Sequence, residues 1–183
     1  MRARKPAAPL SEEDLFDYAV KLLGRQMRTV AEVKRLLRRR VEPGEGGDAK
    51  ISSVLARLKE RKYLNDAAYA QDYAKLRQEN ASFGKRRVQQ DLMRKGVQAP
   101  LIAKTLESAY EDVNEEELAR RHLERKRVKK PASQKEAARV VRMLMRAGFG
   151  SNVIFRILRQ WDVEDETLSA LDSLTEEPEQ SQE

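Results

Sequence analysis

The stretch Leu92-Met93-Arg94-Lys95-Gly96-Val97 returns 52 residues further on as Leu144-Met145-Arg146-Ala147-Gly148-Phe149. The same shift carries Ile102 onto Ile154. Self-similarity at a fixed offset is the sequence signature of tandem units that bury their apolar faces against one another. This stretch therefore predicts a repeat protein, and its glycine marks the end of a helix, where a residue that tolerates positive φ is favoured.

A third copy lies upstream, with a short insertion. Val33 lies 55 residues before Val88, whereas Ile51 lies 51 residues before Ile102. The difference of four residues indicates a longer loop in the first copy, and Glu42–Gly47 supplies it. The chain thus contains three units with a period near 50 residues.

Helix signals dominate each unit. Ser11–Asp14, Thr29–Glu32 and Ser133–Glu136 are capping-box sequences, and Asp66 is a further candidate N-cap. No segment alternates apolar and polar residues long enough to indicate a strand. The spacing predicts helices over 11–25, 29–40, 48–62, 66–79, 83–95, 98–111, 114–129, 133–147 and 150–161.

These elements predict an all-α fold of three tandem three-helix repeats that form an elongated, curved array. The predicted divisions are a disordered N-terminus (1–10), repeat 1 (11–63), repeat 2 (64–112), repeat 3 (113–161) and an acidic C-terminal tail (162–183). Within the tail, Leu168, Leu171 and Leu174 have the spacing of one short amphipathic helix, and disorder is the alternative.

Composition excludes several classes of function. The 183 residues include no cysteine and a single histidine, His122, so a thiolate metal site, a cysteine nucleophile and a Ser-His-Asp triad are not expected. We expect no catalytic residue, no cofactor and no metal ligand. No segment has the roughly 20 apolar residues of a membrane span, and Met1–Pro6 lacks the apolar run of a signal peptide. A cytoplasmic protein is expected.

The charge is unevenly distributed. The formal net charge is +7, but residues 162–183 hold nine acidic residues and no Lys or Arg. The remaining residues carry 37 Lys and Arg against 21 Asp and Glu, a formal charge of +16. Such an excess indicates a polyanionic partner or an acidic protein groove.

Arg39, Arg94 and Arg146 occupy equivalent positions, each two residues beyond the apolar leucine of a second helix. Two residues turn a helix by about 200°, so these side chains are expected to point away from the core. They form a shared basic surface, or they complement the negative ends of their helices. The run Arg120–Lys130 holds seven Lys and Arg in eleven residues, and it is either a solvated helix face or a phosphate-neutralising patch.

The central repeat carries a specific pattern. It begins with Tyr63-Leu64-Asn65-Asp66 and Tyr69-Ala70, followed by Arg77, Gly84, Arg87-Val88, Leu92, Lys95-Gly96-Val97, Ile102 and Leu106. This pattern resembles the RecX family, regulators of the bacterial recombinase RecA, over roughly residues 11–161. Two departures are the loop Pro43–Gly47 and Ala147, which stands where the second repeat has Lys95.

The resemblance implies a non-enzymatic protein that binds in the groove of the RecA filament on single-stranded DNA, with a role in DNA repair, recombination and the SOS response. Such a protein limits filament extension, ATP hydrolysis, strand exchange and LexA cleavage. A monomer with weak DNA binding of its own is expected. The candidate contacts to RecA or DNA are Arg39, Arg86, Arg87, Arg94, Lys95, Arg142 and Arg146.

An alternative function stays open from the residues alone. Three-helix units with a basic second or third helix are also typical of helix-turn-helix proteins, which bind duplex DNA without a protein partner.

Overall fold

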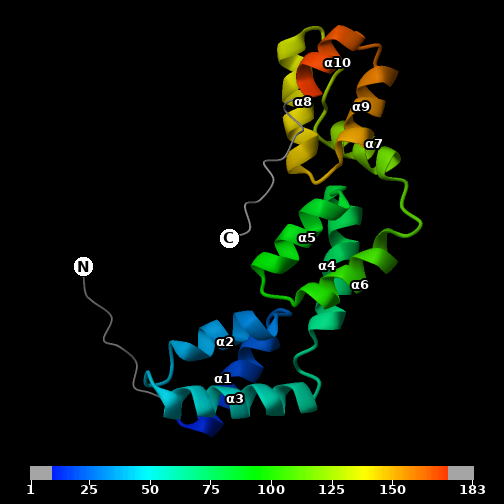
Figure 1. Ribbon diagram of the computed structural model, residues 1–183. Coiled ribbons are helices and arrows are strands. Elements are labelled where there is room, and N and C mark those ends of the chain that lie inside the picture. Colours follow the sequence, from blue (N-terminus) through cyan, green and yellow to red (C-terminus); the bar gives the residue numbers. More distant parts are fainter. Residues whose placement is uncertain (1–9, 173–183) are drawn as a thin grey trace. The chain divides into compact units, whose positions relative to one another are not determined.

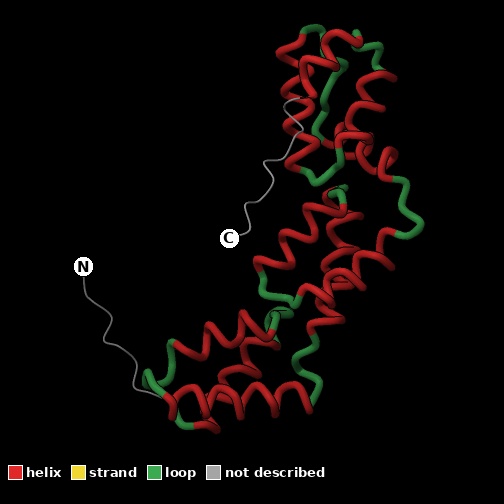
Figure 2. The backbone as a smooth tube through the Cα atoms, viewed as in Figure 1, coloured by secondary structure: helices red, strands yellow, loops and turns green. Residues whose placement is uncertain are grey.

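The computed structural model describes residues 10–172, and within that range the chain consists of ten α-helices and connecting loops, without a strand (Figures 1 and 2). The helices are α1 (Glu12–Leu23), α2 (Val30–Arg38), α3 (Glu45–Glu60), α4 (Asp66–Ala81), α5 (Lys85–Arg94), α6 (Ala99–Tyr110), α7 (Glu115–Arg125), α8 (Gln134–Arg146), α9 (Ser151–Gln160) and α10 (Asp165–Asp172). The all-α prediction is confirmed, and each of the nine expected helices is present. Their arrangement as an elongated, curved array stays a prediction.

Helix starts follow the capping sequences. The backbone N–H of Asp14 donates to the Ser11 hydroxyl at 3.2 Å, and that of Glu136 donates to the Ser133 hydroxyl at 3.3 Å. Thr29 and Glu32 form a complete capping box at the start of α2. These bonds satisfy N–H groups that a helix leaves without an internal partner.

The predicted glycine stops are confirmed. Gly96 and Gly148 lie just after α5 and α8 with φ of 79° and 90°, in the left-handed region. The N–H of the next residue then reaches back to the helix, from Val97 to the Leu92 carbonyl and from Phe149 to the Leu144 carbonyl, each at 3.1 Å. This is the Schellman arrangement, which closes a helix and turns the chain toward the next one.

Helix α7 ends four residues earlier than expected, at Arg125 instead of 129. Arg127 adopts a φ of 53°, and the Val128 N–H donates to the Leu123 carbonyl at 3.0 Å. A non-glycine residue therefore terminates this helix in the same way as Gly96 terminates α5. No glycine stands at this position to indicate the end of the helix.

Helix α3 begins at Glu45, inside the segment expected to be a loop. Gly44 precedes it with a φ of 123°, and Gly47 is buried where a Cβ atom would overlap the carbonyl of Glu42. Close packing of this first turn against the preceding chain outweighs the weak helix propensity of glycine.

The described chain forms two compact units. The first contains residues up to Asp72 together with Leu92–Ile102, and the second contains Tyr73–Asp91 together with the chain from Ala103 onward. The division crosses α4, α5 and α6, so the predicted second repeat contributes residues to both units.

The core of the first unit lies between α1, α2 and α3, which pack on one another. Its buried members are Leu15, Phe16, Ala19, Val33, Leu37, Ile51, Val54, Leu55, Leu58 and Leu64. Leu10, which the sequence placed in a disordered N-terminus, packs against this core, and its N–H donates to the Arg40 carbonyl at 2.9 Å. The rest of that predicted segment lies outside the described residues.

In the second unit α9 packs against α7 and α8, and α10 packs against α8 and α9. Helix α10 is the short amphipathic helix predicted in the acidic segment. Leu168 and Leu171 are 5% and 3% exposed, so the described part of that segment is anchored by apolar contacts. Leu174 and the remainder of the predicted tail lie outside the described residues.

Replacement of Gly148 by alanine tests the importance of these turns. We expect Gly148→Ala to lower the free energy of unfolding by about 2 kcal/mol or more, because the φ is unfavourable for alanine and the new Cβ would overlap the backbone of Arg87. Urea unfolding followed by circular dichroism measures the change. Gly46→Ala is the control, since its Cβ has open space within α3. Equal effects at the two positions would contradict the prediction.

Candidate interaction surface at the repeat junctions

The start of α2 is joined to residues of the second repeat, in what we call the first repeat junction. Thr29 is fully buried, and its hydroxyl donates to the Lys95 carbonyl at 2.6 Å while it accepts from the Glu32 N–H at 3.1 Å. The next N–H, of Val30, donates to the Asp66 carboxylate at 2.9 Å. One helix start therefore binds both the end of α5 and the start of α4.

This contact corrects the predicted role of Asp66. The N-terminal cap of α4 is Asn65, whose side-chain oxygen accepts from the N–H groups of Ala67 and Ala68 at 3.1 and 3.0 Å. Both Asn65 and Asp66 are suitable cap residues, so sequence could not tell which of them caps the helix. Asp66 supplies its carboxylate to the neighbouring repeat instead.

Lys95 holds the same junction with its side chain. Its ammonium lies 3.1 Å from the Glu32 carboxylate and 5.6 Å from the centre of the Tyr69 ring. Partial burial acts to lower the pKa of Lys95, but hydrogen bonds to Tyr69 and Glu32 outweigh it and leave the pKa above its ordinary value. The charge of Lys95 is therefore stabilised by groups of this protein.

A second repeat junction uses the carbonyl at the equivalent position as its acceptor. The Gly84 N–H donates to the Ala147 carbonyl at 2.8 Å. Gly84 lies 55 residues after Thr29, and Ala147 lies 52 residues after Lys95, which are the offsets of the sequence repeat. In both junctions, the carbonyl at this position of one repeat accepts a hydrogen bond from the start of the second helix of the repeat before it.

The side chains differ between the two junctions. Arg87 is the repeat equivalent of Glu32, and Ala147 offers it no charge. Its guanidinium instead lies 3.3 Å from the Asp91 carboxylate and 3.5 Å from the Arg146 carbonyl. Arg87 also lies over the Phe83 ring, 5.6 Å from its centre. It therefore serves the second junction much as Lys95 serves the first.

The predicted contact residues fall into two groups. Five are exposed, namely Arg39, Arg86, Arg94, Arg142 and Arg146, and two are half-buried in the junctions, namely Arg87 and Lys95. Arg94 and Arg146 end their helices, and Arg39 directly follows α2. All three point away from the core as expected, since the leucines two residues earlier are fully buried. They also stand at the ends of their helices, where a cation complements the helix dipole, and a basic surface shared by the three arginines stays a prediction.

A basic groove lies beside the first junction. It has a volume of about 330 Å³, and its lining comprises Ala31, Lys34, Arg35, Arg38, Arg94, Lys95 and Gly96. Arg38 is paired with Asp48 at 3.3 Å. The structure thus brings Arg94 and Lys95 together with Lys34 and Arg35, which were not among the predicted contacts. Their exposed positions on α2 were readable from the sequence, but the approach of α5 was not.

The described residues also bear on catalytic, metal-binding and membrane roles. His122 is 4% exposed, with Nδ1 3.0 Å from the Ala81 carbonyl and its ring near those of Phe83 and Phe149. It is a packed side chain of the second unit. Among residues 10–172 no three His, Asp or Glu side chains gather in a way that could hold a metal ion. No helix in this range has the length and apolar character needed to cross a membrane.

The fold and these contacts define a class: an all-helical tandem-repeat protein in which the turn of one repeat binds the helix start of the repeat before it, with basic side chains exposed around the contact. Family models agree with that class. The model for the second three-helix domain of RecX matches residues 65–106, and the model for its third three-helix domain matches residues 114–158.

Individual relatives identify the family. The regulatory protein RecX of Leptothrix cholodnii is 35% identical over 146 residues, which cover 80% of this chain and 88% of that protein. The regulatory protein RecX of Oceanobacillus iheyensis is 28% identical over 155 residues, covering 83% of this chain but only 55% of that longer protein. A crystal structure of RecX from Lactobacillus salivarius aligns with a TM-score of 0.67 at 22% identity, over 82% of this chain and 96% of that one. The chain belongs to the RecX family.

Substitution of Thr29 measures the first junction. We expect Thr29→Val to lower the free energy of unfolding by about 2 kcal/mol, because it removes both a helix cap and the buried bond to the Lys95 carbonyl. Ser133→Ala removes only the cap of α8 and should cost about 1 kcal/mol. Chemical denaturation of both variants gives the difference, and a smaller loss for Thr29→Val than for Ser133→Ala would refute the structural role of that bond.

Proposed function

We propose that this protein is a non-enzymatic regulator that binds the RecA–DNA filament and restrains its extension, ATP hydrolysis, strand exchange and coprotease activity. Membership of the RecX family is the observation that carries the proposal, together with relatives named regulatory protein RecX. The site of action is the cytoplasm, where RecA and its DNA meet.

The exposed arginines are the proposed contacts. Arg39, Arg94 and Arg146 lie at equivalent positions of three repeats, and a helical polymer presents equivalent acceptors at regular intervals. Several weak contacts of this kind add through the raised effective concentration that each gives to the next. Arg86 and Arg142 extend the same basic character along α5 and α8. Arg87 and Lys95 act as positioning residues, because their charges are already partnered within the junctions.

The proposal assigns specificity to geometry and not to any single ion pair. Exposed ion pairs contribute little individually and are weakened by salt, so one arginine cannot supply tight binding. The spacing of the three helix ends must match that of the polymer for all of them to engage at once. Filament binding is therefore expected to be sensitive to salt and to simultaneous loss of several arginines.

The test is RecA ATPase activity on single-stranded DNA as the protein is titrated. The unchanged protein should lower the activity, and the triple variant Arg39→Glu, Arg94→Glu, Arg146→Glu should require at least about tenfold more protein for the same effect, since loss of about 1.4 kcal/mol of binding energy is a tenfold loss of affinity. The control variant is Lys50→Glu, Lys104→Glu, Lys135→Glu, which makes the same change of net charge at exposed sites of the three repeats. Circular dichroism checks that both are folded.

Unchanged ATPase activity and unchanged filament length at saturating protein would refute the proposal. Tight, sequence-preferring binding to duplex DNA without RecA would favour the helix-turn-helix alternative in its place. An equal loss for the arginine and lysine variants would leave the filament activity in place but would refute these three arginines as its contacts.

A further inference from the structure

The basic run Arg120–Lys130 is divided by the end of α7 into two parts with different surroundings. The helical part is used inside the protein. Arg120 pairs with Glu116 and donates to the side-chain oxygen of Gln160 on α9. Arg125 donates to the carbonyls of Glu79 and Asn80, near the end of α4. These arginines hold α7 against its neighbours and account for part of the charge of the run.

The second part, residues 126–130, is the non-helical linker between α7 and α8, and it is held in a defined conformation. Its first residues close α7 through three hydrogen bonds, from Lys126 N–H to the His122 carbonyl, from Arg127 N–H to the Glu124 carbonyl and from Val128 N–H to the Leu123 carbonyl. Their lengths are 3.1, 2.8 and 3.0 Å. Arg127 is kept in the left-handed region, which is unfavourable for a residue with a side chain.

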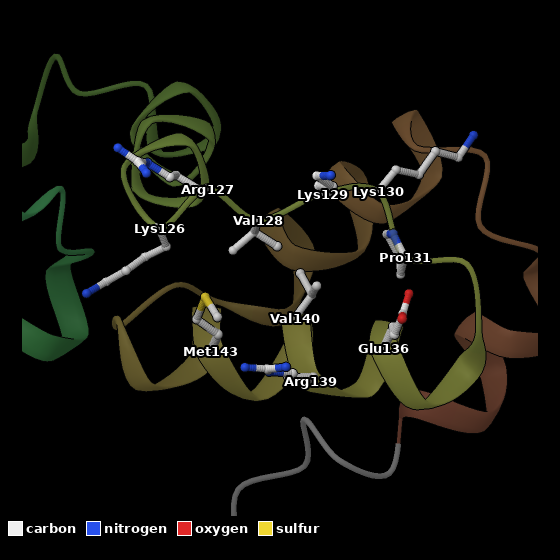
Figure 3. A pocket seen from close by; sticks show the side chains of 10 residues that line it. All are labelled: Lys126, Arg127, Val128, Lys129, Lys130, Pro131, Glu136, Arg139, Val140 and Met143. Carbon is white, nitrogen blue, oxygen red and sulfur yellow. The ribbon is translucent and has the colours of Figure 1, made fainter.

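The linker and one face of α8 together form a pocket with a volume of about 290 Å³ (Figure 3). Val128, Val140 and Met143 point toward one another and make an apolar floor. The basic side chains lie around this floor, and they are Lys126, Arg127, Lys129 and Lys130 from the linker and Arg139 from α8. Glu136 is the one acidic residue in the lining.

Within residues 10–172, these charges are only partly compensated. Lys130 pairs with Asp162 at 2.9 Å, and Glu136 accepts the Ala132 N–H at 2.8 Å as part of the start of α8. Lys126, Arg127 and Lys129 are exposed, and in that range they form no ion pair. Crowding of like charges on a rigid linker is unfavourable in isolation, and a ligand with closely spaced negative charges would relieve it.

We propose that this linker pocket binds the phosphodiester backbone of single-stranded DNA without regard to sequence. Nucleic acid carries a negative charge on every nucleotide, and it can place successive phosphates on the basic rim while a sugar or base covers the apolar floor. The pocket lining contains no aromatic side chain for stacking, so the contact should not depend on base identity. The linker is preformed, so little conformational entropy is lost on binding.

The inference deepens the proposed function, on which it rests for biological relevance, because it assigns the DNA of the filament to a surface separate from the arginines at the helix ends. Its test needs no RecA. Fluorescence anisotropy of labelled oligo(dT) at low salt is measured for the full chain, for Lys126→Glu, Lys129→Glu, and for the control Lys50→Glu, Lys104→Glu with the same net charge. The linker variant should bind about tenfold more weakly than the control, and oligo(dA) should behave like oligo(dT).

The salt dependence of the affinity for oligo(dT) is an independent test of the proposal. Each phosphate contact to a single strand contributes about 0.7 to the slope of log affinity against log salt, so loss of two contacts should reduce the slope by about 1.4. The milder variant Lys126→Gln, Lys129→Gln provides the same comparison if the glutamate variant does not fold. Equal affinities of linker and control variants would overturn the proposal. Preferential binding of an acidic peptide over oligo(dT) would assign the pocket to a protein ligand and also overturn it.

The two proposals fail in distinguishable ways. DNA binding that is lost in the linker variant, with no effect of the protein on RecA, would support the pocket and refute the filament function. Restraint of RecA ATPase activity, with DNA affinity indifferent to the linker, would support the filament function and refute the pocket.

Discussion

The structure depends on one backbone carbonyl in each turn between the second and third helices of a repeat. The carbonyls of Lys95 and Ala147 each accept a hydrogen bond from the residue that starts the second helix of the preceding repeat. A buried carbonyl without a partner costs free energy comparable to a lost hydrogen bond, so each turn requires the neighbouring repeat at a defined position. The glycine that follows allows this approach, since Gly96 and Gly148 lie against the neighbouring backbone or Cβ atoms with no space for a side chain.

This constraint explains why the two junctions keep the same carbonyl acceptor although their side chains differ. Thr29 donates from a hydroxyl and Gly84 donates from its N–H, yet both reach the same position of the repeat. The pair Glu32 and Lys95 in one junction is replaced in the other by Arg87, which bonds to the Asp91 carboxylate and the Arg146 carbonyl. Repeat-equivalent positions can therefore carry different side chains, as Glu32 and Arg87 or Lys95 and Ala147 do, while the acceptor carbonyl is kept.

Sequence reasoning succeeded where local physics decides the outcome. The repeat offsets, the caps at Ser11, Thr29 and Ser133 and the stops at Gly96 and Gly148 were all readable from residue types and spacing. It failed where packing between segments determines the structure. Nothing in the local sequence shows that Asn65, and not Asp66, caps α4. The early end of α7 was missed because Arg127 takes a backbone conformation that its residue type disfavours, in a turn closed by main-chain hydrogen bonds to Leu123 and Glu124. The end of α7 divides the basic run Arg120–Lys130 into arginines that bond to neighbouring helices and cations that line a pocket.

Helix α10 has a consequence for how the third repeat is shielded from water. Its first residue lies 50 positions after that of α7, which itself lies 49 after that of α4, and Leu168 takes the place of Leu118 and Tyr69. The helix thus lies at the sequence offset of a first helix of a repeat, and it packs on α8 and α9. Packed there, it covers apolar surface of the third repeat that would otherwise face water. A variant without this helix would expose the apolar side chains of α8 and α9 beneath Leu168 and Leu171.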